Sequence, residues 1–90
     1  MTVLSRTVLM TNKRGLHARA SAKFVNLAAA LPSNIEVEKD GNKVCGTSIM
    51  GLMMLGAAMG DSVVLHVSGD GAAESIEQLA TLIEGRFGED

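Results

Sequence analysis

One short segment holds most of the residue types that could do chemistry. Gly15 and Leu16 are followed directly by His17, and Arg19 stands two positions further on, within an alanine-rich run. This order predicts a tight turn at the glycine, an imidazole at the start of a helix and a guanidinium in its first turn. Helix N-termini favour anions because their N–H groups are unpaired. Because a neutral imidazole is also a good nucleophile near physiological pH, the segment predicts a phosphoryl group carried on His17.

Basic residues gather around this histidine. Lys13, Arg14 and Lys23 join Arg19 near His17, although the formal net charge of the chain is −2. The cluster fits a positive patch for a phosphoryl group and an acidic partner, but it also fits ordinary solubilising charge. A histidine before a helix is, likewise, often a simple capping or surface residue. The chain has no Trp or Tyr and only two Phe, so it lacks the basic, aromatic surface typical of nucleic-acid binding.

Length and composition favour one domain over residues 1–90, with a two-layer core, because 47% of the residues are hydrophobic. The single Cys45 cannot form an internal disulfide, and no paired Cys and His spacing suggests zinc. We therefore expect no metal, no cofactor and a cytoplasmic location. No secretion signal and no apolar run of membrane-spanning length are apparent, so we expect no insertion into a membrane.

The hydrophobic pattern predicts the elements that position the histidine. Alternation predicts strands at Val3–Met10, Ile35–Lys39, Asn42–Cys45 and Ser62–Val67, with a hairpin at Asp40-Gly41. Helical spacing predicts helices at Ala18–Ala30, which Pro32-Ser33-Asn34 ends, and at Ile49–Leu55. After a turn at Ser68–Gly71, a third helix is predicted with Ile76, Leu79, Ala80, Ile83 and Phe87 on one face. The order β-α-β-β-α-β-α predicts an α+β two-layer sandwich, with helices on one face of the sheet and solvent on the other.

The helix predicted at Ile49–Leu55 is apolar nearly all round. Leu52 and Leu55 can form the stripe that faces the core. A second apolar face is then left over, made of Ile49, Met50 and Met53. Exposed methionines are typical of surfaces that dock several partners, although fuller wrapping of this helix or a dimer contact are alternatives. Thr47 or Ser48 is expected to cap the helix.

Two segments together resemble HPr, the histidine-containing phosphocarrier of the bacterial phosphotransferase system. Gly15–Ala20 resembles its active-site motif, and Thr47–Met53 resembles its regulatory-serine segment. The resemblance covers essentially the whole chain in length, element order and spacing between the two motifs. It implies an open-faced β-sandwich, with three helices on one face of a four-stranded antiparallel sheet.

The resemblance also implies roles for individual residues. His17 would accept a phosphoryl group on Nδ1 from phosphorylated enzyme I and pass it to an enzyme IIA protein. The Arg19 side chain and the backbone N–H groups of Ala18 and Arg19 would stabilise the phosphoryl group. The family's docking surface matches Ile49, Met50 and Met53. Ser48 matches the serine that an HPr kinase/phosphorylase modifies in some members. A carrier of this kind is not a stand-alone enzyme, and we expect a monomer, because it presents one face to successive partners.

One position departs from the family motif. Ala20 stands where proline commonly follows the arginine. Alanine is compatible with the first turn of a helix, so we expect the chemistry to survive. The change resembles the nitrogen-related branch of the family, which leaves both sugar transport and nitrogen regulation open.

Two other classes of function also fit parts of the sequence. The first is a non-catalytic regulatory module that docks partners through the methionine-rich helix. The second is a small ligand-binding domain of ferredoxin-like type, whose element order is close. The other histidine, His66, is expected on the solvent face of the sheet with Val64 and Ser68, as a plain surface residue.

Overall fold

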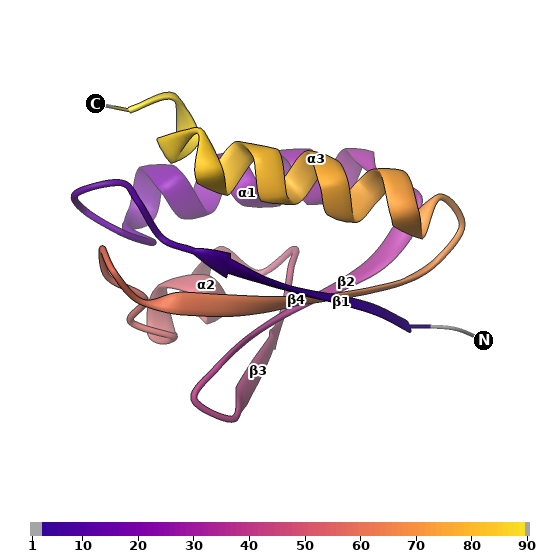
Figure 1. Ribbon diagram of the computed structural model, residues 1–90, viewed down its shortest axis with the longest axis horizontal. Coiled ribbons are helices and arrows are strands. Elements are labelled where there is room, and N and C mark those ends of the chain that lie inside the picture. The colour runs from indigo at the N-terminus through magenta and orange to yellow at the C-terminus, as the bar shows by residue number, and fades with distance from the viewer. Residues whose placement is uncertain (1–2, 90) are drawn as a thin grey trace.

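The computed structural model describes residues 3–89 and confirms the predicted α+β open-faced sandwich (Figure 1). Its elements are β1 (Val3–Leu9), α1 (Ala18–Ala30), β2 (Ser33–Lys39), β3 (Asn42–Cys45), α2 (Ile49–Met54), β4 (Ser62–Gly69), α3 (Ala72–Glu84) and a 3-10 turn (Arg86–Gly88). The strands form one sheet in the order β1-β4-β2-β3, and every neighbouring pair is antiparallel.

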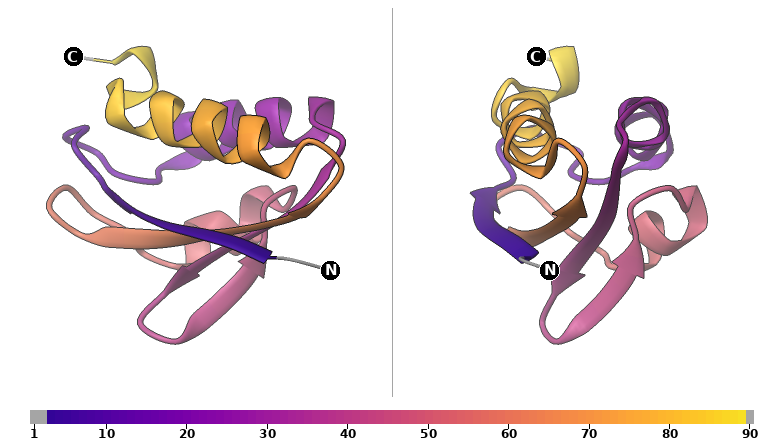
Figure 2. Two further views of the ribbon diagram at one scale, coloured as in Figure 1. Left: turned by 45° about the vertical axis from the view of Figure 1, so that its right-hand side comes forward. Right: turned by 90° about the vertical axis from the view of Figure 1, so that its right-hand side faces the viewer.

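The helices form the second layer. Figure 2 shows α1 and α3 side by side above the sheet, with α2 beside the edge strand β3. α3 packs on β1 and β4, whereas α1 packs against both α3 and α2. The largest fully buried side chains include Phe24, Phe87, Met10, Leu52, Leu65, Leu79 and Ile83. Within residues 3–89, no helix is both long and apolar enough to cross a membrane.

The central strand β4 shows the predicted alternation. Val63, Leu65 and Val67 are fully buried beneath the helices, whereas His66 lies on the other face. His66 is less exposed than predicted because it bridges the neighbouring strands. Its Nδ1 lies 2.9 Å from the Ser5 hydroxyl in β1, and its Nε2 lies 2.6 Å from a carboxylate oxygen of Glu38 in β2.

The sheet extends further at one end than the pattern predicts. Ser33 pairs with Gly69, so β2 begins in the segment predicted to end the first helix, and β4 continues into the predicted turn. The polar residues at this end show no alternation of apolar and polar side chains, although the backbones of β2 and β4 still pair there. At the other end β1 stops at Leu9, and the main chain of the buried Met10 bonds to the loop before β4 instead.

Two helices are shorter than predicted. α2 ends at Met54, and Leu55 is its C-terminal cap. α3 ends at Glu84, so Phe87 does not lie on its face but in the 3-10 turn, where it is nevertheless buried. Arg86 and Phe87 have φ angles of +60° and +54°, and this left-handed backbone turns the chain back over the core. A buried aromatic at helical spacing thus fits either a longer helix or a returning turn.

The loop after β1 is held against the loop after α2. Gly15 has a φ of +60°, and a Cβ on it would lie 2.2 Å from the carbonyl oxygen of Ala57. The next residue, Leu16, donates its N–H to that same oxygen at 2.9 Å. The approach requires glycine both for its conformation and for its lack of a side chain.

We expect Gly15→Ala to lower the free energy of unfolding by at least about 2 kcal/mol, because it adds a steric clash to the cost of a left-handed alanine. Urea denaturation measures this loss. Gly41→Ala is the matched control, because Gly41 has a φ of +82° and open space where a Cβ would stand. Its loss should be about 1 kcal/mol. Equal losses in the two variants would show that the contact with Ala57 contributes nothing.

Candidate functional site

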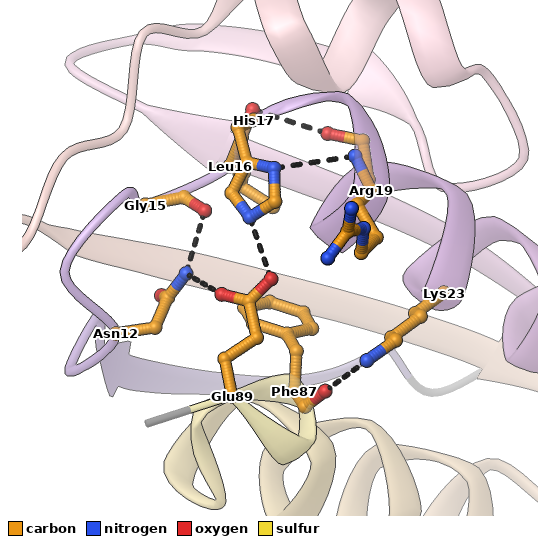
Figure 3. A network of polar contacts seen from close by, with 9 residues as sticks. Asn12, Gly15, Leu16, His17, Arg19, Lys23, Phe87 and Glu89 are labelled. Atoms are coloured by element: carbon orange, nitrogen blue, oxygen red, sulfur yellow. Dashed lines mark hydrogen bonds and ion pairs between the residues drawn. The ribbon is translucent and has the colours of Figure 1, made fainter.

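His17 stands at the N-terminus of α1 as its N-cap residue (Figure 3). Its extended backbone, with φ −73° and ψ 178°, turns the ring back over the first turn of the helix. Nδ1 accepts a long hydrogen bond of 3.3 Å from the backbone N–H of Arg19. Because Nδ1 acts as an acceptor, the neutral ring carries its proton on Nε2. The nitrogen that faces the helix terminus is therefore the one with a free electron pair.

The opposite nitrogen meets a carboxylate from the far end of the chain. Nε2 of His17 lies 2.7 Å from Oε2 of Glu89, and only 15% and 18% of the two side chains are exposed. The other oxygen of Glu89 accepts a 3.1 Å hydrogen bond from the buried Asn12, which also donates to the Gly15 carbonyl at 2.8 Å. Sequence reasoning missed Glu89, because nothing local relates a residue 72 positions away to His17. It also missed Asn12, whose contact with the site is made through Glu89.

The environment of Glu89 favours its ionised form. Burial by itself raises the pKa of this carboxyl group, but the hydrogen bonds from Asn12 and His17 and the electrostatic attraction of His17 and Lys23 outweigh it. Together they hold the pKa of Glu89 below its ordinary value of 4.5. An anion therefore sits beside the imidazole at neutral pH.

Further contacts fix the returning C-terminal turn. Lys23, on the second turn of α1, donates a 2.6 Å hydrogen bond to the carbonyl oxygen of Phe87 (Figure 3). The Phe87 ring is buried, and Gly88 continues the turn with a φ of +75°. The turn is thus anchored by one apolar and one polar contact directly before Glu89.

A hollow of about 400 Å³ opens beside this network. It is lined by Lys13, Arg14, Arg19, Lys23, Gly88 and Glu89. Within residues 3–89, none of its four cations is within ion-pair distance of a carboxylate. Unpaired cations around one hollow create a positive potential that attracts an anion. No group of three or more His, Cys, Asp and Glu within the same residues is placed to hold a metal ion.

The predicted surplus face of α2 is exposed. Leu52 is fully buried and Leu55 nearly so, whereas the apolar residues on the solvent side are Ile49, Met50 and Met53. Sequence reasoning missed two further members, Met54 and Met59, which are also exposed. We call these five exposed residues the methionine patch. The bond from Leu16 to Ala57 ties the segment that follows α2 to the segment that presents His17.

Ser48 caps α2. Its hydroxyl oxygen accepts the N–H of Gly51 at 2.9 Å, as a helix N-cap does. The serine lies directly before the methionine patch, and its side chain is partly accessible.

The chain matches the model of one protein family, described as the PTS HPr component phosphorylation site, over residues 4–85. It is 44% identical to the phosphocarrier protein HPr of Cupriavidus necator, over 97% of this chain and 98% of that protein. It is 35% identical to the phosphocarrier protein NPr of Shewanella violacea, over 99% and 98% of the two chains. The crystal structure of HPr from Thermoanaerobacter tengcongensis superimposes with a TM-score of 0.92 at 47% identity, covering 97% of this chain and 98% of that one.

The family model extends over both motifs and over the strands and helices from β1 to α3. These similarities decide against the ferredoxin-like ligand-binding domain as the alternative fold. Relatives named HPr and NPr both match, so the similarity spans the general and the nitrogen-related branches. The chain belongs to the HPr family of phosphocarriers of the phosphotransferase system.

Proposed function

We propose that His17 accepts a phosphoryl group on Nδ1 from phosphorylated enzyme I and passes it to a histidine of an enzyme IIA protein. One observation carries this proposal. The electron pair of Nδ1 faces the start of α1 and the N–H of Arg19, while Nε2 is occupied by Glu89. A nucleophile directed at a helix terminus, next to a hollow lined by cations, suits the transfer of an anionic group.

The transfer itself needs positioning and charge stabilisation more than covalent help. The Nδ1 electron pair forms a bond to phosphorus while the bond from phosphorus to the donor nitrogen breaks. The Nε2 proton stays on the ring. The phosphoryl oxygens then replace Nδ1 as acceptor for the backbone N–H of Arg19 and also accept from the N–H of Ala18, and the Arg19 guanidinium adds positive charge. The bond from Arg19 to Nδ1 is long, so giving it up costs little.

The methionine patch is our candidate for the surface that docks both enzyme I and enzyme IIA. Flexible thioether side chains adapt to different partner surfaces, which a shuttle must meet in turn. A monomer can offer the patch and His17 to one partner at a time. Because both partners would use the same face, binding to each must be weak enough to release.

Ser48 is our candidate for regulatory phosphorylation by an HPr kinase/phosphorylase. A phosphate at the N-terminus of α2 is tolerated within the protein, because the helix terminus favours negative charge. The same charge next to the methionine patch opposes docking of an apolar surface. Phosphorylation of Ser48 would thus act on partner binding rather than on His17 itself.

The exposed methionine patch also supports a second candidate function. A regulatory module could dock partners through this patch without accepting a phosphoryl group. His17 would then be replaceable without loss of function, whereas the carrier requires it.

Wild-type protein incubated with phosphoenolpyruvate and enzyme I should gain one phosphoryl group, lost in mild acid, and His17→Ala should gain none. Intact mass spectrometry measures the gain, and enzyme I of both the sugar and the nitrogen-related systems is used as donor. His66→Ala is the matched control, because it removes the other imidazole, and it should be phosphorylated like wild type. A phosphoryl group on folded His17→Ala would refute the assignment, and no gain in wild type would favour the docking module.

We expect Arg19→Ala to slow phosphoryl acceptance about tenfold without abolishing it, because an exposed cation contributes modestly to stabilisation of the phosphoryl group. Quenched-flow measurement with limiting enzyme I gives the rate. Lys39→Ala removes a positive charge that does not line the hollow and should leave the rate unchanged. Equal rates in wild type and Arg19→Ala would make Arg19 an ordinary surface charge.

Ser48→Asp should weaken binding of enzyme I about tenfold, because it places a charge beside the methionine patch. Isothermal titration calorimetry with enzyme I measures the affinity. Ser68→Asp makes the same change on the open face of the sheet and should leave the affinity as it is. If both variants bind like wild type, a charge at Ser48 has no effect on docking, and the proposed regulation has no physical basis.

A further inference from the structure

We propose that Glu89 is a positioning residue for phosphoryl transfer: its carboxylate holds the ring of His17 so that Nδ1 is presented for attack. This inference rests on the function proposed above and names a residue that neither the active-site motif nor the regulatory-serine segment contains. Its basis is the contact network in Figure 3, which joins the two ends of the chain.

The imidazole is held at both nitrogens at once. Glu89 accepts from Nε2 at 2.7 Å, and the N–H of Arg19 donates to Nδ1 at 3.3 Å. Turning the ring over would place carbon atoms against both partners and break both hydrogen bonds. Donating to Glu89 also requires the proton to be on Nε2, which leaves the electron pair on Nδ1. One carboxylate therefore selects both the orientation and the tautomer.

The carboxylate is itself held in place. Asn12 is buried and bonds the second oxygen of Glu89 while it bonds the turn at Gly15. Lys23 holds the carbonyl of Phe87, two residues before Glu89. Asn12 thus holds the Glu89 side chain, and Lys23 of α1 holds the turn that carries it. A surface carboxylate that merely lies near a histidine lacks such support.

The same contact assists the chemical step. When the Nδ1 electron pair bonds to phosphorus, the ring becomes positively charged, because it keeps its proton on Nε2. Oε2 of Glu89 already lies 2.7 Å from Nε2 of that ring, so stabilisation of the positive charge needs no rearrangement. When the phosphoryl group leaves for the acceptor histidine, the ring returns to its neutral form with the Nε2 proton still shared with Glu89.

The test compares Glu89→Ala with Glu84→Ala, which removes another C-terminal carboxylate whose partner is Arg6 rather than His17. Proton and nitrogen NMR of the labelled protein follows the exchange of the His17 Nε2 proton with water. His66 is an internal reference, because its Nε2 is held by Glu38 at 2.6 Å. In Glu89→Ala we expect exchange at His17 to be at least about tenfold faster, with His66 unchanged, and phosphoryl acceptance from enzyme I to be about tenfold slower.

Glu89→Gln separates position from charge, because it keeps one acceptor oxygen for Nε2 but carries no charge. We expect its acceptance rate to lie between those of wild type and Glu89→Ala. Unchanged exchange at His17 in Glu89→Ala, or an unchanged acceptance rate, would overturn the role of Glu89. Failure of wild type to accept a phosphoryl group would instead count against the proposed function, while the exchange measurement still tests the contact.

Discussion

The close approach of Gly15 to Ala57 is the contact on which the geometry of the site depends. It fixes a left-handed turn in a place where no side chain fits, and it places the Ala57 carbonyl where it accepts a hydrogen bond from the N–H of Leu16. Leu16 then buries its side chain in the core, so the main chain reaches His17 in a determined direction. Because His17 is the next residue and caps α1, the conformation of the turn determines where the imidazole ring lies. A phosphoryl acceptor in a flexible loop would have to order itself at every transfer, at an entropic cost that this arrangement avoids.

The C-terminal turn, which carries Glu89 to His17, contains backbone strain that other interactions must offset. Two non-glycine residues, Arg86 and Phe87, have left-handed backbones, each at a cost of about 1–2 kcal/mol. Burial of the Phe87 ring contributes about 2–3 kcal/mol, which roughly offsets that cost. The turn is therefore near balance on these two terms, and its polar contacts decide its position. Those contacts come from Lys23 and, through Glu89, from His17 and Asn12, all of them at the site. Strain that persists next to a reactive group is typical of functional segments.

Most of the fold could be predicted because a core imposes periodicity on the sequence. β4 alternates since its helix-facing side is buried, and α2 has an apolar surplus since only Leu52 and Leu55 face inward. Element ends were harder to predict. The pairing of Ser33 with Gly69 is made by backbone groups, which leave no trace in side-chain type. The prediction that Phe87 lies on the third helix was wrong, because an apolar residue at helical spacing does not reveal whether the chain is still helical.

The residues of the candidate site also divide into those with local sequence features and those brought together only by folding. The placement of His17 at a helix start, with Arg19 in the first turn, could be predicted because a glycine turn and a helix start are local features of adjacent residues. Glu89 and Asn12 could not, because their roles arise only when the C-terminal turn folds back on the loop after β1. The HPr resemblance did not supply them either, since it rested on two internal motifs. A titratable residue near a chain end, following a buried aromatic, is the only sequence signal that could have drawn attention to Glu89.

The distribution of charge around His17 suits a carrier rather than a binding protein. A tight phosphate site would bury its cations and pair them closely with the anion, where each charge-assisted bond is strong. Here Lys13, Arg14 and Arg19 are exposed, whereas Lys23 is half-buried. Water screens the exposed charges, so each contributes about 1 kcal/mol or less. Glu89, an anion that also lines the hollow, is largely shielded from solvent and contacts the ring of His17. For the function proposed above, such an arrangement favours a phosphoryl group that is readily accepted yet remains accessible to an acceptor, which is the balance that transfer demands.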